Sequence, residues 1–281
     1  MARVSGKEPQ LVEVSPEAAS GSPRHFYRDN ERMILGAASF IGFFLFWEVG
    51  AAVGWVDLFF FSSPVRIISA GFREMQLPRF WNDVWVSGQE LVIGYALAVV
   101  LGIPLGIFTG WYRRLNYFFD PWLNFMNALP RVALLPLIVL WVGIGIWSKI
   151  LVVFLGAYIT ILINTLYGVR TVDKRYLDVA HSFNASQGRV FTTVVLPGSV
   201  PFILAGLRLG VGRALVGVIV GELYSANAGI GYMIALSSQT LQTDRLLFGV
   251  VLLTLMGVVL VELLRIVEKR FQKWRPSVGS R

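Results

Sequence analysis

Long stretches without a charged residue are the feature that most constrains the fold of this sequence. Two of them, Leu91–Tyr112 and Ile150–Val169, contain no Asp, Glu, Lys or Arg. A helix needs about 20 predominantly apolar residues to cross the hydrocarbon core of a bilayer. Hydrophobic residues make up 55% of the chain and charged residues only 15%, whereas a soluble domain carries roughly 25% charged residues. These proportions indicate a polytopic membrane protein and argue against a water-soluble enzyme.

Four further apolar segments, each carrying a few charges, are long enough to cross a bilayer. The expected fold is therefore all-α, with about six transmembrane helices. Leu223–Thr243 is also uncharged, but its many Ser, Thr, Asn and Gln residues make it a poor span. Pro130 and Pro136 are expected to kink or break the third helix, because proline lacks a backbone donor. The expected spans are Met33–Val56, Leu91–Tyr112, Phe118–Trp141, Ile150–Val169, Ser199–Glu222 and Leu246–Leu264.

Glycines at four-residue spacing mark two of these helices. Gly102, Gly106 and Gly110 follow one another on the second span, and Gly206 and Gly210 repeat the spacing on the fifth. Small residues at this spacing let helix backbones approach closely in lipid. The pattern predicts close packing, either within the chain or against a second copy, and for any one stripe packing within the chain is favoured.

The basic residues predict the orientation and the domains. A cytoplasmic N-terminus places 17 of the 25 Lys and Arg residues on the cytoplasmic side, as the positive-inside rule requires. Both termini are then cytoplasmic, and the net charge of +8 needs no nucleic acid to explain it. We expect a mobile cytoplasmic tail over 1–32, a membrane domain over 33–268 with a cytoplasmic loop at 171–200, and a basic cytoplasmic tail over 269–281. Residues 1–32 lack the apolar region of a signal peptide.

The cytoplasmic loop between the fourth and fifth spans is expected to contain a short amphipathic helix. Asp173 is a suitable N-cap residue. Tyr176, Ala180 and Phe183 fall at i, i+4 and i+7 and are expected to share one face. Asn184 suits the end of this helix, because Asn tolerates a left-handed backbone better than most residues. An exposed apolar face of this kind either docks on a cytoplasmic partner or lies flat in the lipid interface.

This loop resembles the coupling-loop signature of ABC importer permeases. That signature runs Glu-Ala-Ala, three residues, Gly, nine residues, and then a hydrophobic residue, any residue and Leu-Pro. Here Asp stands for Glu, Val for the first Ala and Asn for Gly, and each keeps the local property of the residue that it replaces. The matching positions are Asp178, Val179, Ala180, Asn184, Leu196 and Pro197.

Flanking motifs extend the resemblance from about residue 40 to residue 275. They include Ala128-Leu129-Pro130, Gly206-Leu207-Arg208 and Gly229-Ile230-Gly231-Tyr232. Together they are similar to permeases of the nitrate, sulfonate, taurine and bicarbonate group. The resemblance implies a type I ABC importer permease fold with a cytoplasmic coupling helix, in a bacterial inner membrane.

The same resemblance implies the partners. These are a second copy of the chain, two ABC ATPase subunits in the cytoplasm, and a periplasmic or lipid-anchored substrate-binding protein. The helix around Tyr176–Asn184 would sit in a groove of each ATPase, with Ala180 and Phe183 as packing contacts. Asp178 would either orient the helix or meet a basic residue of the partner.

The sequence predicts no catalytic or metal site in this chain. It has no GxxxxGK[ST] loop to hold phosphates, so ATP and magnesium are expected to bind the partner ATPase and this chain is not expected to be an enzyme. With two His and no Cys, no metal site is expected, and no cofactor is expected to bind.

Charged residues inside the expected spans are the remaining functional candidates, because a charge is costly in lipid and usually faces protein or water. Arg131, Pro136, Arg213 and Glu222 are candidates for a path taken by a small, anionic solute such as a sulfonate, taurine, nitrate or a related organic acid. Arg213 either meets that anion or forms a structural pair with another span. The competing hypothesis is a stand-alone secondary transporter or channel, which should show inverted repeats or coupling carboxylates at mid-depth. Neither is evident.

Overall fold

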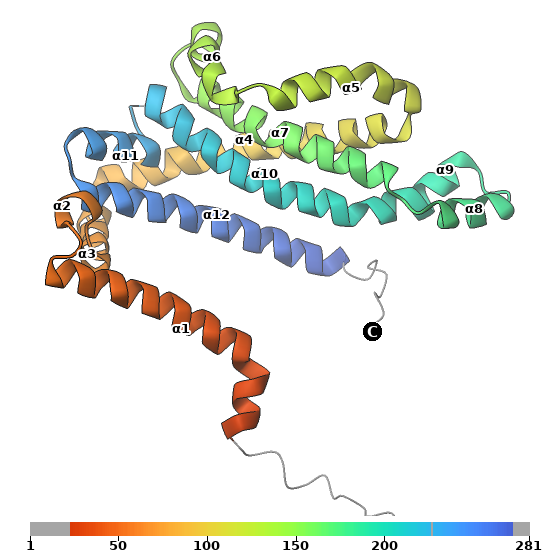
Figure 1. Ribbon diagram of the computed structural model, residues 1–281. Coiled ribbons are helices and arrows are strands. Elements are labelled where there is room, and N and C mark those ends of the chain that lie inside the picture. Colours follow the sequence, from red (N-terminus) through yellow and green to blue (C-terminus); the bar gives the residue numbers. More distant parts are fainter. Residues whose placement is uncertain (1–22, 226, 272–281) are drawn as a thin grey trace, which may run out of the picture. The chain divides into compact units, whose positions relative to one another are not determined.

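The computed structural model describes residues 23–225 and 227–271. Within this described part every regular element is a helix (Figure 1), which confirms the all-α class. The elements are α1 (Pro23–Val53), α2 (Leu58–Phe61), α3 (Pro64–Met75), α4 (Pro78–Trp111), α5 (Arg113–Ala128), η2 (Arg131–Leu134), α6 (Leu135–Val142), α7 (Ile146–Arg170), α8 (Lys174–Ser182), α9 (Gln187–Val190), η3 (Phe191–Val195), α10 (Leu196–Ser225), α11 (Ile230–Gln239) and α12 (Thr243–Phe271).

The helices confirm the predicted number of spans. In the described residues, five helices are long and apolar enough to cross a membrane, or six if the bent pair α5–α6 is one span. Three of the predicted spans fall inside α7, α10 and α12, and a fourth, Leu91–Tyr112, ends one residue past α4. The poor span is occupied by α11, which has only 10 residues.

At each end of the membrane domain a helix extends past the predicted boundary. Helix α1 begins at Pro23, whereas the sequence predicts a mobile tail as far as residue 32; its candidate membrane span does begin at Met33. The earlier start has a simple physical reason, since an existing helix gains one hydrogen bond for each residue that it adds. Helix α12 likewise continues to Phe271, past residue 268. The predictions for residues 1–22 and 272–281 lie outside the described residues.

The third span is broken, as its prolines predict. Helix α5 ends at Ala128, and the axis turns by 86° before α6. Pro130 stands at the N-terminal boundary of η2, within this break. Pro136 lies in the first turn of α6, where a helix does not need the missing N–H group. Pro130 therefore accompanies the break, while Pro136 starts a helix.

The chain divides into two units after Leu58. In the second unit α7 is the central helix and packs along both α4 and α10. Val153, Ala157 and Ile161 on α7 have no exposed surface, so the core of this unit follows the α7 axis.

The two glycine stripes let α4 and α10 lie close to α7. A Cβ atom on Gly106 of α4 would lie 2.7 Å from the carbonyl oxygen of Leu162. A Cβ atom on Gly217 of α10 would lie 2.8 Å from the Cα of Val153. Distances this short exclude any larger residue without movement of a backbone. The stripes thus serve packing within the chain.

The two ends of this unit carry different structures (Figure 1). Helix α11 lies at one end, against α12 and the last turns of α10. Helices α8 and α9 lie at the opposite end, beyond the last turn of α7. The two ends and the pocket between them contain the candidate functional residues.

Candidate functional site

Helix α8 has the ends that the sequence predicts. The Asp173 side chain accepts a hydrogen bond from the Arg175 N–H at 3.0 Å, so it is the N-cap. Its carboxylate also bonds the Arg175 guanidinium, and these bonds hold the pKa of Asp173 below its ordinary value. At the other end Asn184 has φ +52°, which confirms the predicted left-handed residue.

Helix α8 has one half-buried and one exposed face. Leu177 and Ala180 pack on a cluster of buried valines from α7, α9 and η3. Tyr176, Val179 and Phe183 point outward with exposed fractions of 58%, 57% and 83%. The prediction that Ala180 shares the outer face is wrong. Position 180 lies only about 40° around the helix from position 176, so it stands at the border between the two faces, and contact with the valine cluster places it with Leu177.

The remaining coupling-loop candidates lie on α8 itself and at the start of α10. Asp178 is exposed on α8, and its backbone carbonyl accepts a bond from the Ser182 hydroxyl at 2.9 Å. Leu196 and Pro197 open α10 and are half-buried. The π-helical turn η3 joins them to α9 without a break in the backbone. Through η3 the coupling loop is continuous with α10.

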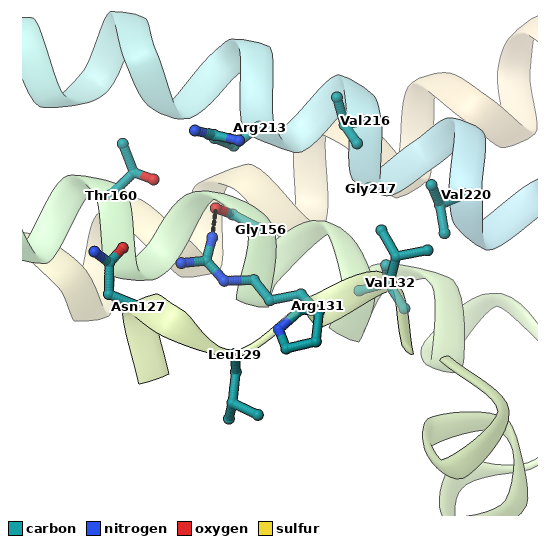
Figure 2. A pocket seen from close by; sticks show the side chains of 12 residues that line it. Asn127, Leu129, Arg131, Val132, Gly156, Thr160, Arg213, Val216, Gly217 and Val220 are labelled. Carbon is teal, nitrogen blue, oxygen red and sulfur yellow. Dashed lines mark hydrogen bonds between the residues drawn. The ribbon is translucent and has the colours of Figure 1, made fainter. Parts of the chain in front are cut away.

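A pocket of about 270 Å³ lies where the break between α5 and η2 meets α7 and α10 (Figure 2). We call it the arginine pocket, because Arg131 and Arg213 both line it. Arg131 donates from Nη1 to the carbonyl oxygen of Gly156 at 2.9 Å. Neither arginine forms an ion pair with a residue that the structure describes.

Glu222 lies elsewhere, at the α11 end of the unit. Its side chain is 1% exposed, and Oε1 accepts a hydrogen bond from the Ser87 hydroxyl at 2.6 Å. Together with Asp83 these side chains accept bonds from the three successive N–H groups of residues 229–231, at the start of α11. The bonds run from Gly229 N to Asp83 Oδ1 (2.8 Å), from Ile230 N to Ser87 Oγ (2.8 Å) and from Gly231 N to Glu222 Oε2 (2.5 Å).

A buried ion pair completes this group. Lys149 Nζ lies 2.6 Å from Glu90 Oε1, and their side chains are 7% and 0% exposed. Lys149 stands in the first turn of α7, which begins at Ile146, ahead of the expected span Ile150–Val169. We refer to Asp83, Ser87, Glu90, Lys149 and Glu222 as the polar cluster.

The polar cluster accounts for the two glycines of the flanking motif Gly229-Ile230-Gly231-Tyr232. Gly229 has φ +124°, a conformation that L side chains rarely adopt. A Cβ atom on Gly231 would lie 2.8 Å from the Cβ of Glu222. Glycine at both positions therefore lets the start of α11 sit directly on the Glu222 carboxylate.

The structure brings two of the four path candidates together. Arg131 and Arg213 share the arginine pocket, Glu222 belongs to the polar cluster, and Pro136 is exposed on α6 outside the lining of that pocket. The polar residues of the pocket that sequence reasoning missed are Asn127 and Thr160. No local sequence pattern predicts these two residues as neighbours, because the 86° break after α5 is what brings that helix to the pocket.

The α4 part of the polar cluster was also missed, although it carries a signal. Asp83, Ser87 and Glu90 fall at i, i+4 and i+7, so they share one face of a helix. Three polar residues on one face, just before an uncharged span, indicate a buried polar contact.

These features define a class of protein: a helical multi-span membrane protein with a short exposed helix between two of its spans. The family of the "binding-protein-dependent transport system inner membrane component" matches residues 102–273, and the chain belongs to this family. It is therefore a permease component of a transport system, and the family is one of non-catalytic membrane components.

Related permeases align with most of this sequence. The aliphatic sulfonates transport permease protein SsuC of Bacillus subtilis is 33% identical over 82% of this chain and 84% of its own. The taurine transport system permease protein TauC of Escherichia coli is 30% identical over 83% and 86%. Among solved structures, the MetNI methionine ABC transporter in an inward-facing conformation matches with a TM-score of 0.57 and 17% identity, over 69% of this chain and 95% of that chain. That likeness supports the type I importer permease fold.

Proposed function

We propose that two copies of this chain form the membrane pore of an ATP-driven importer, with one ATPase subunit docked on each α8. The observation that carries the proposal is the outer face of α8. Phe183 is 83% exposed at the end of this helix, beside Tyr176 and Val179. Aromatic residues on a rigid support are typical centres of protein interfaces. The valine cluster beneath α8 supplies that support.

Movement of the ATPases would reach the spans through a short chain of contacts. Leu177 and Ala180 hold α8 to buried valines of α7, α9 and η3, and η3 runs directly into α10. Helix α10 packs along α7 and carries Arg213 of the arginine pocket. A displacement of α8 therefore acts on the helices that enclose the pocket.

The other partners and the location follow from the family and from the charges. The family name supports a separate substrate-binding protein. The excess of basic residues on the α8 side supports a cytoplasmic location for α8 and both termini, in the inner membrane of a bacterial cell. ATP and magnesium would be bound by the ATPase subunits and not by this chain.

The solute is proposed to be a small organic acid anion. Relatives named for aliphatic sulfonates and for taurine cover more than four fifths of this chain. Both names denote solutes with a sulfonate group.

The test of the docking model is Phe183→Asp, with Phe183→Leu as the matched control. A carboxylate in the centre of an apolar interface is strongly destabilising. We expect the aspartate variant to insert normally, to lose the ATPase subunits on purification and to lose ATP-driven uptake in proteoliposomes. The leucine variant keeps an apolar contact and should retain most of both. Recovery of a fully coupled complex from Phe183→Asp would refute the docking model.

A further inference from the structure

The arginine pocket contains two cations that form no ion pair with any described residue. Arg131 uses one of its five N–H donors on the Gly156 carbonyl. Arg213 lies across the same pocket near the middle of α10 (Figure 2). None of the described residues that line the pocket is acidic. Two guanidinium groups that line one pocket repel each other, and an anion bound between them would relieve this repulsion.

The lining is divided into a polar and an apolar end. Along α7 the lining residues are Val152, Gly156 and Thr160, and along the antiparallel α10 they run from Val220 to Arg213. The two helices therefore place threonine with arginine at one end and valine with valine at the other. Figure 2 shows this division, with Asn127 beside the polar end and Val132 beside the apolar end.

We propose that the arginine pocket binds an organic monoanion, with its oxyanion head between Arg131 and Arg213 and its apolar tail against the valines. The proposal rests on the proposed transport function, because it identifies the class of solute that passes between α5, α7 and α10. Sulfonate and carboxylate heads share the chemistry that two arginines recognise. The volume of about 270 Å³ is near the lower end for small-molecule sites.

The division of the lining makes the site selective in two ways. An inorganic anion such as nitrate leaves the apolar end unfilled and gains nothing from the valines. A zwitterion such as taurine carries an ammonium group into a pocket without a described carboxylate. Each CH₂ group placed against apolar surface contributes about 0.8 kcal/mol, or about fourfold in affinity.

The experiment is equilibrium binding to the purified complex of permease and ATPase subunits, without a binding protein. Four probes separate the contributions of the anionic head, the apolar tail and an added ammonium group. They are butanesulfonate, ethanesulfonate, taurine and nitrate. Ethanesulfonate and taurine differ by one ammonium group, and butanesulfonate and ethanesulfonate by two CH₂ groups. We expect affinity to fall from butanesulfonate to ethanesulfonate and then to taurine and nitrate, by about 15-fold between butanesulfonate and ethanesulfonate.

Substitutions of residues that line the arginine pocket test whether the anion binds there. Arg131→Gln and Arg213→Gln should each weaken butanesulfonate binding by about 10-fold or more, and Arg213→Lys by less, since it keeps the charge and loses the planar fork. Val216→Ser should weaken butanesulfonate binding and leave nitrate binding unchanged. Arg265→Gln, which removes an exposed arginine of α12, is the control and should match the unsubstituted protein.

The outcomes distinguish this proposal from the docking model. Co-purification of the ATPase subunits depends on α8 and tests the docking model alone. If the complex assembles but binds none of the sulfonates saturably, or binds them equally well without either arginine, the anion site is refuted. Equal affinity for nitrate and butanesulfonate would refute the proposal that the valines bind the apolar tail. If Arg131→Gln or Arg213→Gln fails to assemble, Arg213→Lys and Val216→Ser still decide the question.

Discussion

The polar cluster and the arginine pocket both place charged side chains inside apolar helices, and they treat those charges in opposite ways. In the polar cluster Glu90 meets Lys149 at 2.6 Å, and Glu222 accepts bonds from Ser87 and from the start of α11. In the arginine pocket, two cations line one pocket with no described counter-ion.

The difference distinguishes a structural from a functional use of charge. A buried group that finds its partners within the chain fixes the positions of the elements that carry those partners. In the polar cluster these are α4, α7, α10 and α11. A charge without a partner costs free energy unless another molecule supplies one, so it indicates a binding site. Substitutions in the polar cluster should therefore change stability, and those in the arginine pocket should change binding.

The largest effect is expected for Lys149→Met. The substitution leaves the Glu90 carboxylate, which is fully buried, without its cation. Removal of one partner of a buried ion pair typically costs about 3–5 kcal/mol, so the thermal unfolding temperature of the purified protein should fall sharply. The double variant Glu90→Gln/Lys149→Met should recover most of the loss, because it removes both charges. An unchanged unfolding temperature for Lys149→Met would show that the pair does not hold α4 to α7.

A smaller loss is expected for Ser87→Ala. The hydroxyl both donates to Glu222 and accepts from Ile230 N, and loss of a buried hydrogen-bond partner costs about 1–3 kcal/mol. Hydrogen exchange should also become faster in residues 229–231. Thr254→Ala is the matched control, because its hydroxyl bonds only the carbonyl one turn back, on an exposed face of α12. Equal stability of the two variants would mean that the Ser87 hydrogen bonds do not hold the start of α11 in place.

The sequence predicts the helices of this protein far better than its sites, and the reason is physical. An uncharged run such as Ile150–Val169 has one stable form in a bilayer, because every backbone group must bond within the helix. The coupling helix is similarly local, since Asp173 and Asn184 act on their own neighbours in the chain. These features could be read from residues a few positions apart.

The arginine pocket could not be predicted in the same way. Arg131 and Arg213 are far apart in the sequence, and they meet because the chain turns by 86° after α5. Pro130 indicates a break there, but it does not fix the angle. Ala180 shows a milder form of the same limit, because which side of a short helix is buried depends on the valines that it meets.

Helix α10 carries one arginine with an ion-pair partner and one without a described partner, so the two can be compared on the same helix. Arg208 bonds Glu268 of α12, whose side chain is 7% exposed, whereas Arg213 has no ion pair among the described residues. Because the Arg208 side chain is 44% exposed, we expect Arg208→Gln to cost about 1–2 kcal/mol, less than a fully buried pair. Arg213→Gln should stay within about 0.5 kcal/mol. Denaturation of the two variants side by side is the measurement, and a larger loss for Arg213→Gln would make Arg213 a structural residue.

The smallest effect is expected for the exposed pair Asp173–Arg175, which extends the comparison to a charge in water. Asp173→Asn keeps a side chain that can cap α8 and removes only the charge. We expect hydrogen exchange in the first turn of α8 to rise by no more than about threefold, since exposed ion pairs contribute little. Asp173→Ala, which removes the cap as well, should show a larger increase. An equal increase in both variants would mean that the charge, and not the cap, holds the start of α8.

The pH dependence of this turn has a definite sign. Bonds from Arg175 hold the pKa of Asp173 below its ordinary value, which is about 3.9 in an unfolded chain. The stabilisation by the charge is therefore fully present above that ordinary value and is lost as the pH falls through the lowered pKa. Exchange in the first turn of α8, corrected for its intrinsic pH dependence, should not change between neutral pH and about pH 5. Asp173→Asn should remove the change at lower pH, and a pH dependence that persists in this variant would assign the titration to another group.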